Sequence, residues 1–242
     1  MGILVQRQFS VARDDRREFE RQSRLGVWEN MRHNGAQMIA YGTWAFGGRG
    51  DVVVTHSVYE NFDHWTATRA WGEFATENAR VEETRHIRAI HAGRNRLVTE
   101  SSARIIDYDD ELSEPTPRYR NVGEPLAALP STFGPQSIVE QSEFSLQRGG
   151  EDALASTLRD TIWPWLTSQG ARIVIFGHDP LQSDDNVVTY IAYRDISHWN
   201  ELKGRRAKVP DAVAAAREAL HPLVESQSSQ LLMVMTEFGA SA

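Results

Sequence analysis

The sequence predicts an α+β protein built from two tandem copies of one β-α-β-β-α-β unit, because its clearest motif is written twice. Val53 to Trp65 reads VVTHSVYENFDHW, and residues 187–199 read VVTYIAYRDISHW, an offset of 134 positions. Each copy opens with β-branched residues, which favour a strand, and then reaches Asn61 or Asp195, side chains that cap helices. A strand, a cap and a helix therefore follow one another in both halves.

The first strand and the first helix are also duplicated. Ile3–Val11 (ILVQRQFSV) matches Ile138–Leu146 (IVEQSEFSL) at an offset of 135, and both stretches read as strands. We expect a helix after Asp15, since apolar residues recur there at helical spacing. It should end at Gly35, and its copy at Gly170, because glycine most easily takes the left-handed turn after a helix.

The rest of each unit follows from the same periodicities. The expected elements are second strands at Ala36–Ala45 and Ala171–His178, a helical tract at Trp71–His91, a fourth strand at Ser102–Asp107, a helix at Ala212–Leu220 and a last strand at Gln230–Phe238. Gly42 and Gly177 stand in register within the two second strands.

Three segments result: a first ferredoxin-like repeat at 1–108, a connector at 109–137 and a second ferredoxin-like repeat at 138–242. The connector holds five of the nine prolines, and proline disfavours a helix before it, so we expect an extended segment on the surface. Each unit has an open sheet with one face free of helices. Two such sheets in one chain can cover each other.

The composition narrows the function classes. The net charge of −7 argues against general attraction to nucleic acid or to an anionic membrane. The absence of cysteine removes disulfides, thiolate metal sites and thiol nucleophiles. No run is long and apolar enough to cross a bilayer, and the N-terminus lacks the residue order of a signal peptide, so we expect a cytoplasmic protein.

One pattern resembles a known family. The residues that carry it are Gly42, Trp44, Gly50, Val54, Tyr59, His64 and Trp65. With the duplication, they resemble the NIPSNAP family of the dimeric α/β barrel superfamily, over about residues 3–107 and 138–238. The resemblance implies a dimeric α/β barrel formed within one chain. It also implies the activities of that superfamily, which include cofactor-independent or flavin-assisted oxygenases of polyketide quinols in antibiotic biosynthesis, small isomerases and haem enzymes.

Positions at which the two copies disagree are the better candidates for chemistry, since a shared core needs no asymmetry. The unequal pairs are His56 and Tyr190, Thr43 and His178, Trp44 and Asp179, and Asn30 and Trp165. His56 alternates with Val54 and Val58 and so shares their face of the third strand. Three interpretations of His56 stay open: a histidine that lines a cavity, a core histidine with a polar partner, or a metal ligand.

Duplicated side chains are expected to serve the shared fold first. His64 and His198 lie in the first turn of a helix, whose dipole favours a neutral ring, and we expect them to bond to backbone groups or to the next strand. Trp65 is expected in the core. Tyr59 and Tyr193 end the third strands, where a phenol either finds a partner or faces a pocket.

A cavity between sheet and helices that is lined by such residues would suit a flat aromatic ligand. A neutral imidazole could take a proton from a quinol, which then reacts with dioxygen. His56 is the first choice for this base and His178 the second. The residues expected to bind the substrate are Tyr59, Trp44, Tyr190, Tyr193, Trp165, His64 and Trp65. The alternatives are a non-enzymatic NIPSNAP-type binding or scaffold protein and a haem-dependent enzyme.

No tightly bound cofactor is expected. His86 and His91 lack the spacing and the carboxylate of a metal site, so we expect no metal. Gly47–Gly50 (GGRG) joins two strands and reads as a hairpin turn rather than a phosphate cradle. Reduced flavin supplied by another protein is compatible with the resemblance, and the sequence leaves haem open, with any of the eight histidines as its ligand.

The expected partners are an aromatic small molecule and dioxygen, without nucleic acid or membrane. A duplicated chain can complete its barrel alone. Apolar residues on the outer helices, such as Trp71 and Leu202, would nevertheless allow two chains to pair as a homodimer.

Overall fold

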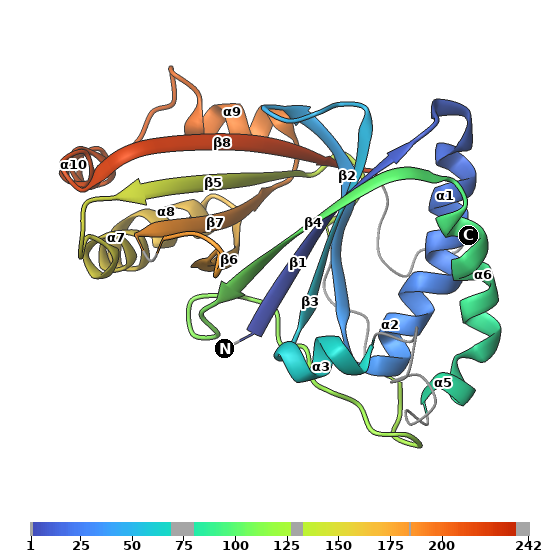
Figure 1. Ribbon diagram of the computed structural model, residues 1–242. Coiled ribbons are helices and arrows are strands. Elements are labelled where there is room, and N and C mark those ends of the chain that lie inside the picture. Colours follow the sequence, from blue (N-terminus) through green and yellow to red (C-terminus); the bar gives the residue numbers. More distant parts are fainter. Residues whose placement is uncertain (1, 69–79, 127–132, 184, 236–242) are drawn as a thin grey trace.

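Eight strands close into one barrel in the computed structural model, which describes residues 2–68, 80–126, 133–183 and 185–235 (Figure 1). The strand order around the barrel is β1-β3-β2-β8-β5-β7-β6-β4. Each half contributes four neighbouring strands, and its helices lie outside them. The predicted α+β class, with two ferredoxin-like repeats that form a dimeric α/β barrel within one chain, is confirmed.

The two halves contain the same order of elements, except that η1 and α5 occur in the first half alone among the described residues. The first half contains β1 (Gly2–Val11), η1 (Arg13–Asp15), α1 (Arg16–Gln22), η2 (Ser23–Trp28), α2 (Glu29–Asn34), β2 (Gln37–Phe46), β3 (Val52–Tyr59), α3 (Phe62–Ala67), α5 (Arg80–Glu83), α6 (Arg85–Asn95) and β4 (Val98–Tyr108). The second half contains β5 (Ile138–Leu146), α7 (Glu151–Thr157), η3 (Leu158–Ile162), α8 (Trp163–Ser168), β6 (Arg172–His178), β7 (Asn186–Tyr193), α9 (Ile196–Lys203), α10 (Asp211–Leu220) and β8 (Val224–Val234).

Gly42 and Gly177, the two glycines in register, lie at the two places where a strand of one half pairs with a strand of the other. Gly42 lies where β2 pairs with β8, and Gly177 lies where β6 pairs with β4. A Cβ atom at Gly42 would overlap the carbonyl oxygen of Met233, and one at Gly177 would overlap that of Asp107. Only a residue without a side chain allows the strands of the two halves to approach this closely.

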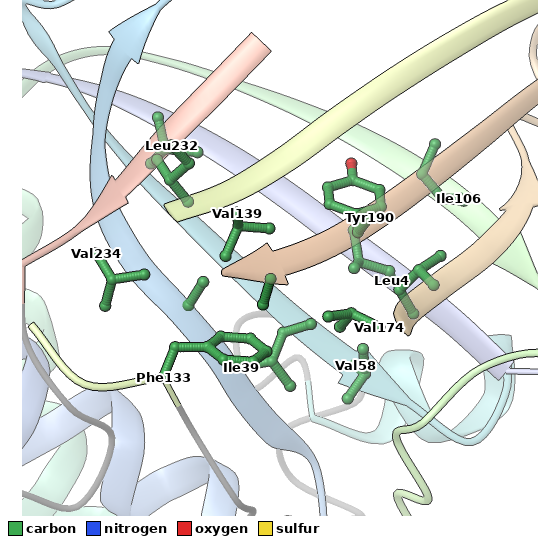
Figure 2. Packing of buried hydrophobic residues seen from close by; sticks show 14 of the residues in the cluster. Leu4, Ile39, Val58, Ile106, Phe133, Val139, Val174, Tyr190, Leu232 and Val234 are labelled. Atoms are coloured by element: carbon green, nitrogen blue, oxygen red, sulfur yellow. The ribbon is translucent and has the colours of Figure 1, made fainter. Parts of the chain in front are cut away.

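Apolar side chains pack in three layers, one inside the barrel and one beneath the helices of each half. The inner layer mixes residues of both halves, including Leu4, Val58, Ile106, Val139, Val174 and Leu232 (Figure 2). Phe19 and Trp28 belong to the outer layer of the first half, and Leu154 and Leu166 to that of the second. Strands β3 and β7 therefore have both faces covered.

The two predicted helix caps are present. Asn61 Oδ1 accepts the backbone N–H of His64 at 2.8 Å, and Asp195 Oδ1 accepts that of His198 at 2.8 Å. Each cap satisfies one of the N–H groups that a helix leaves without a partner at its start. The prediction of strand, cap and helix in both halves is thus confirmed.

We expect Asn61→Ala and Asp195→Ala each to lower the free energy of unfolding by about 1 kcal/mol, the usual loss for a removed N-cap. Urea denaturation measures the effect. Ser197→Ala, on the same helix as the second cap, is the control and should leave the midpoint unchanged. Equal midpoints for all three variants would show that these caps do not stabilise the fold.

The described part of the connector contains no helix and is mostly exposed, as expected, but some of its side chains are buried. Arg120 is 6% exposed, and its guanidinium forms a two-pronged ion pair with Glu83 at 2.8 and 2.9 Å. Phe133 packs in the inner layer of the barrel (Figure 2), with the guanidinium carbon of Arg172 4.4 Å from its ring centroid. The gain from burying this aromatic ring explains why the segment leaves the surface.

Two further expectations concern the helical tract Trp71–His91 and the exposure of Leu202. Positions 71–79 of the predicted tract Trp71–His91 lie outside the described residues; beyond them, α6 continues to Asn95. Leu202 is 7% exposed and packs in the outer layer of the second half, so the prediction that it is available for dimerisation is wrong. Within the described ranges, no helix has both the length and the apolar character that a membrane crossing requires.

Candidate functional site

One of the unequal pairs, His56 and Tyr190, is in contact inside the barrel. Gln6 Nε2 donates to Gln141 Oε1 at 2.8 Å, and the two glutamines occupy equivalent positions on β1 and β5. His56 lies opposite Gln6, and Tyr190 lies opposite Gln141. The pseudo-twofold relation between the halves therefore places His56 beside Tyr190.

His56 and Tyr190 are fully buried, and their rings meet edge to face with centroids 5.0 Å apart. Among the described residues, neither the two ring nitrogens of His56 nor the hydroxyl of Tyr190 has a hydrogen-bond partner. Burial lowers the pKa of His56 to about 3 and raises the pKa of Tyr190 above its ordinary value. Both side chains are neutral at pH 7.

Charged residues flank this pair on one side. Arg104 Nε donates to Asp179 Oδ2 at 2.7 Å, and Arg104 Nη1 donates to Glu143. The counterparts of Asp179 and Glu143 in the other half are Trp44 and Gln8, and Trp44 Nε1 donates to Gln8 Oε1 at 3.4 Å. Trp44 is thus buried inside the barrel, where it bonds to a neutral side chain instead of an arginine.

His178 lies apart from His56 and faces the helices outside the barrel. Its Nε2 is 2.9 Å from Glu151 Oε1 on α7, and its Nδ1 is 3.2 Å from the carbonyl oxygen of Asn186. Its ring stands edge-on to Phe176, a member of the outer layer of the second half. The two histidines proposed as bases are therefore not brought into one site.

Tyr193 and Trp165 belong to the same outer layer of the second half. Tyr193 donates to Glu140 Oε2 at 2.9 Å, and Lys203 Nζ lies 3.4 Å from the same oxygen. The guanidinium carbon of Arg217 is 5.4 Å from the ring centroid of Trp165. Glu140 therefore places a buried acidic group among these residues.

The duplicated histidines bond to the backbone, as expected. His64 Nδ1 accepts the N–H of Glu60 at 3.1 Å, so its Nε2 carries the hydrogen and donates to the carbonyl oxygen of Asn34 at 2.7 Å. His198 repeats this arrangement with distances of 3.2 and 2.9 Å. Trp65 packs against the outer layer of the first half.

A cavity of about 380 Å³ lies between the sheet and the helices of the first half; we call it the first cavity. Its polar lining includes Tyr59, Asn30, His91, Arg7, Arg94 and Asn95, and its apolar walls include Phe9, Val27, Met31, Met38 and Val98. Of the residues proposed from the sequence for the substrate, Tyr59 lines this cavity. His56 and Tyr190 do not line it, because they point into the barrel.

The second half has a cavity of about 480 Å³ in the equivalent place; we call it the second cavity. Its walls are mainly aliphatic and aromatic, with Phe144, Leu158, Ile162, Leu166, Ile191 and Leu220. Its charged and polar lining includes Lys203, Arg217, His221 and Gln227. Both cavities thus lie on the outer faces of the strands, beneath helices.

Sequence reasoning missed the basic residues of the first cavity. On α6, Ile87, His91 and Arg94 follow one another at helical spacing, and Ile87 and Arg94 are buried. A charged residue on an otherwise buried helical stripe was the available signal. The part of the chain that the structure describes contains no cluster of three or more metal-binding side chains.

Neither a protein-family model nor a curated protein matches the sequence, whereas solved structures match its fold. A proposed monooxygenase from Fusobacterium nucleatum subsp. nucleatum is 11% identical, with a TM-score of 0.62 over 97% of this chain and 93% of that one. An anthrone oxidase-like protein is 12% identical, with a TM-score of 0.56 over 100% of this chain and 95% of that one. The chain shares the two-repeat barrel fold with both.

NIPSNAP proteins are also among the solved structures that match part of this chain. A NIPSNAP domain protein from Burkholderia xenovorans is 24% identical over 40% of this chain and 92% of that one, with a TM-score of 0.35.

Proposed function

We propose that the protein is an oxygenase of a small aromatic quinol and that the first cavity is its active site. The lining of this cavity carries the proposal, because a histidine, a tyrosine and an asparagine meet apolar walls there. Binding sites for small molecules combine apolar walls with a few polar groups in this way. The fold shared with a proposed monooxygenase and an anthrone oxidase-like protein supports the reaction class.

His91 takes the role of general base in this proposal. It lines the first cavity, whereas His56 is fully buried inside the barrel and His178 contacts Glu151 outside it. Tyr59 and Asn30, which line the same cavity, are assigned to hold the ring hydroxyls of the substrate. The proposal thus keeps a cavity between sheet and helices, as expected from the sequence, and replaces His56 by His91, on α6, as the base.

The proposed reaction needs no external reductant. His91 accepts a proton from a phenolic hydroxyl, and the phenolate gives electrons from a ring carbon to dioxygen, so that a C–O bond forms and a hydroperoxide results. Loss of water then breaks the O–O bond and leaves a hydroxyquinone. One oxygen atom enters the product, the other leaves as water, and all four electrons come from the quinol.

The proposed substrates are fused-ring quinols of the polyketide type, because the apolar walls offer contact to more than one ring. A haem enzyme would instead show a Soret band, with His91 or His221 as the histidine that lines a cavity. A NIPSNAP-type binding protein would bind the quinol without consuming oxygen.

We expect the purified protein to convert a reduced naphthoquinone into its hydroxyquinone, with one atom of ¹⁸O from ¹⁸O₂ in the product. His91→Ala should lower turnover by about 10² to 10⁴-fold, the usual contribution of a general base. Oxygen uptake and the mass of the product measure both results.

The control is His221→Ala, which removes the histidine of the second cavity and should leave turnover unchanged. His56→Phe tests the base chosen from the sequence, and it should also retain turnover. If neither reduced naphthoquinones nor reduced anthraquinones give product above the protein-free reaction, the proposed function is wrong.

A further inference from the structure

The first cavity contains two arginines that have no acidic partner among the described residues. Arg94, on α6, is 4% exposed, and Arg7, on β1, is half-buried; both line the cavity. Within the described residues, no ion pair joins either arginine to a carboxylate. Glu100 also lies at the lining, but it is exposed, with one oxygen 3.7 Å from Arg49.

Neutral groups hold the Arg94 guanidinium in place. Its Nε donates to Ser23 Oγ at 2.7 Å and its Nη1 donates to Asn95 Oδ1 at 3.2 Å. Its central carbon lies 4.5 Å from the ring centroid of Phe9 and 4.1 Å from that of Phe19. Its Nη2 makes no hydrogen bond to the described residues. The cation is thus oriented but not neutralised.

An unpaired buried cation is costly, because it has lost its hydration without gaining an opposite charge. Burial lowers the pKa of Arg94 to about 10, so the side chain is still charged at pH 7. Proteins pair such groups with carboxylates or leave them for an anionic ligand. The contacts of Arg94 with the described residues therefore leave room for an anion.

In the second half, a carboxylate of the chain itself, that of Glu140, lies beside a cation of the cavity lining. The second cavity is lined by Lys203 and Arg217, and the buried carboxylate of Glu140 lies 3.4 Å from Lys203 Nζ. In the first half, the position of Glu140 is taken by Val5. Among the described residues, an internal counter-charge is thus present in the second half and absent from the first.

The two arginines are also specific to the first half. Val98 begins β4 and Val224 begins β8, and this correspondence makes Leu220 the counterpart of Arg94. Ser142 is the counterpart of Arg7. The first cavity therefore carries positive charge at two positions where the second cavity has uncharged residues.

We propose that the first cavity binds its ligand through a carboxylate, which pairs with Arg94 and Arg7 while the rings lie against the apolar walls. The planar guanidinium fork matches a carboxylate with two parallel hydrogen bonds. The choice of an aromatic ligand rests on the proposed function, and it makes the substrate a quinol that bears a carboxylate.

Calorimetric titration without oxygen tests the proposal with 3-hydroxy-2-naphthoate and its neutral carboxamide as probes. The carboxylate should bind the wild-type protein at least about 10-fold more tightly, as expected for charge-assisted hydrogen bonds. Arg94→Met should weaken carboxylate binding by about 10- to 100-fold and leave carboxamide binding unchanged. Arg7→Gln should weaken it less, because Arg7 is more exposed.

Arg217→Met is the matched control, since it removes a cation of the second cavity and should leave carboxylate binding unchanged. The proposal is overturned if the wild-type protein binds both probes equally, or binds neither at millimolar concentration. It is also overturned if Arg217→Met causes the same loss as Arg94→Met. Should Arg94→Met fail to fold, the comparison of probes on the wild-type protein and Arg7→Gln still decides.

Binding and turnover separate this proposal from the proposed function. Selective binding of the carboxylate without oxygen uptake would support the anion site and contradict the oxygenase. Oxygenation of neutral quinols, with no preference for those that bear a carboxylate, would support the oxygenase and contradict the anion site.

Discussion

Replacing Arg104 by methionine should lower the free energy of unfolding by about 3 kcal/mol, near the lower end of the loss when the partner of a buried charge is removed. Arg104 lies on β4 of the first half, whereas its partners Asp179 and Glu143 belong to the second. Asp179 has a side chain only 6% exposed, so its carboxylate would remain in the barrel without a counter-charge. Chemical denaturation measures the loss.

Two comparisons identify the cause of this loss. Adding Asp179→Asn and Glu143→Gln to the Arg104→Met variant should recover much of the stability, because the two carboxylates without a counter-charge are then removed. Arg159→Met, which breaks an exposed pair with Asp160, should change stability by less than about 0.5 kcal/mol. An equal effect of Arg104→Met and Arg159→Met would mean that water already compensates the charges inside the barrel.

Local signals were sufficient to predict most of the fold. The caps Asn61 and Asp195 and the terminating glycines Gly35 and Gly170 act on neighbouring backbone groups, and each occurs twice. The sequence alternation also placed His56 on one face with Val54 and Val58, as observed. It could not decide whether this face lies inside or outside the barrel, because both faces of β3 are buried.

The candidate site was harder to predict for the same reason. Comparison of the copies favoured unequal pairs such as His56 and Tyr190, which the barrel then packs against each other. The pair Arg94 and Leu220 is just as unequal, but the halves differ in length before this helix, and the correspondence emerges only from the strands that follow. The length difference therefore concealed this charge asymmetry.

His56 should make the protein less stable as the pH falls below about 6.5. In the folded chain its pKa is lowered to about 3, whereas in the unfolded chain it takes up a proton near pH 6.5. Between these values the unfolded state binds one more proton, so the free energy of unfolding decreases by about 1.4 kcal/mol per pH unit. At pH 4.5 the loss is about 2.5 kcal/mol, and urea denaturation between pH 4.5 and pH 7.5 measures it.

His56→Phe isolates this contribution from that of the carboxylates, which titrate in the same range. Phenylalanine keeps a ring against Tyr190 and takes up no proton, so the stability difference between variant and wild type should grow as the pH falls. His56→Gln serves the same purpose if phenylalanine packs poorly, and His221→Ala, at an exposed histidine, should leave the pH dependence unchanged. A difference that is constant with pH would show that the folded barrel protonates His56. That result would require a buried partner for its ring nitrogens, such as ordered water.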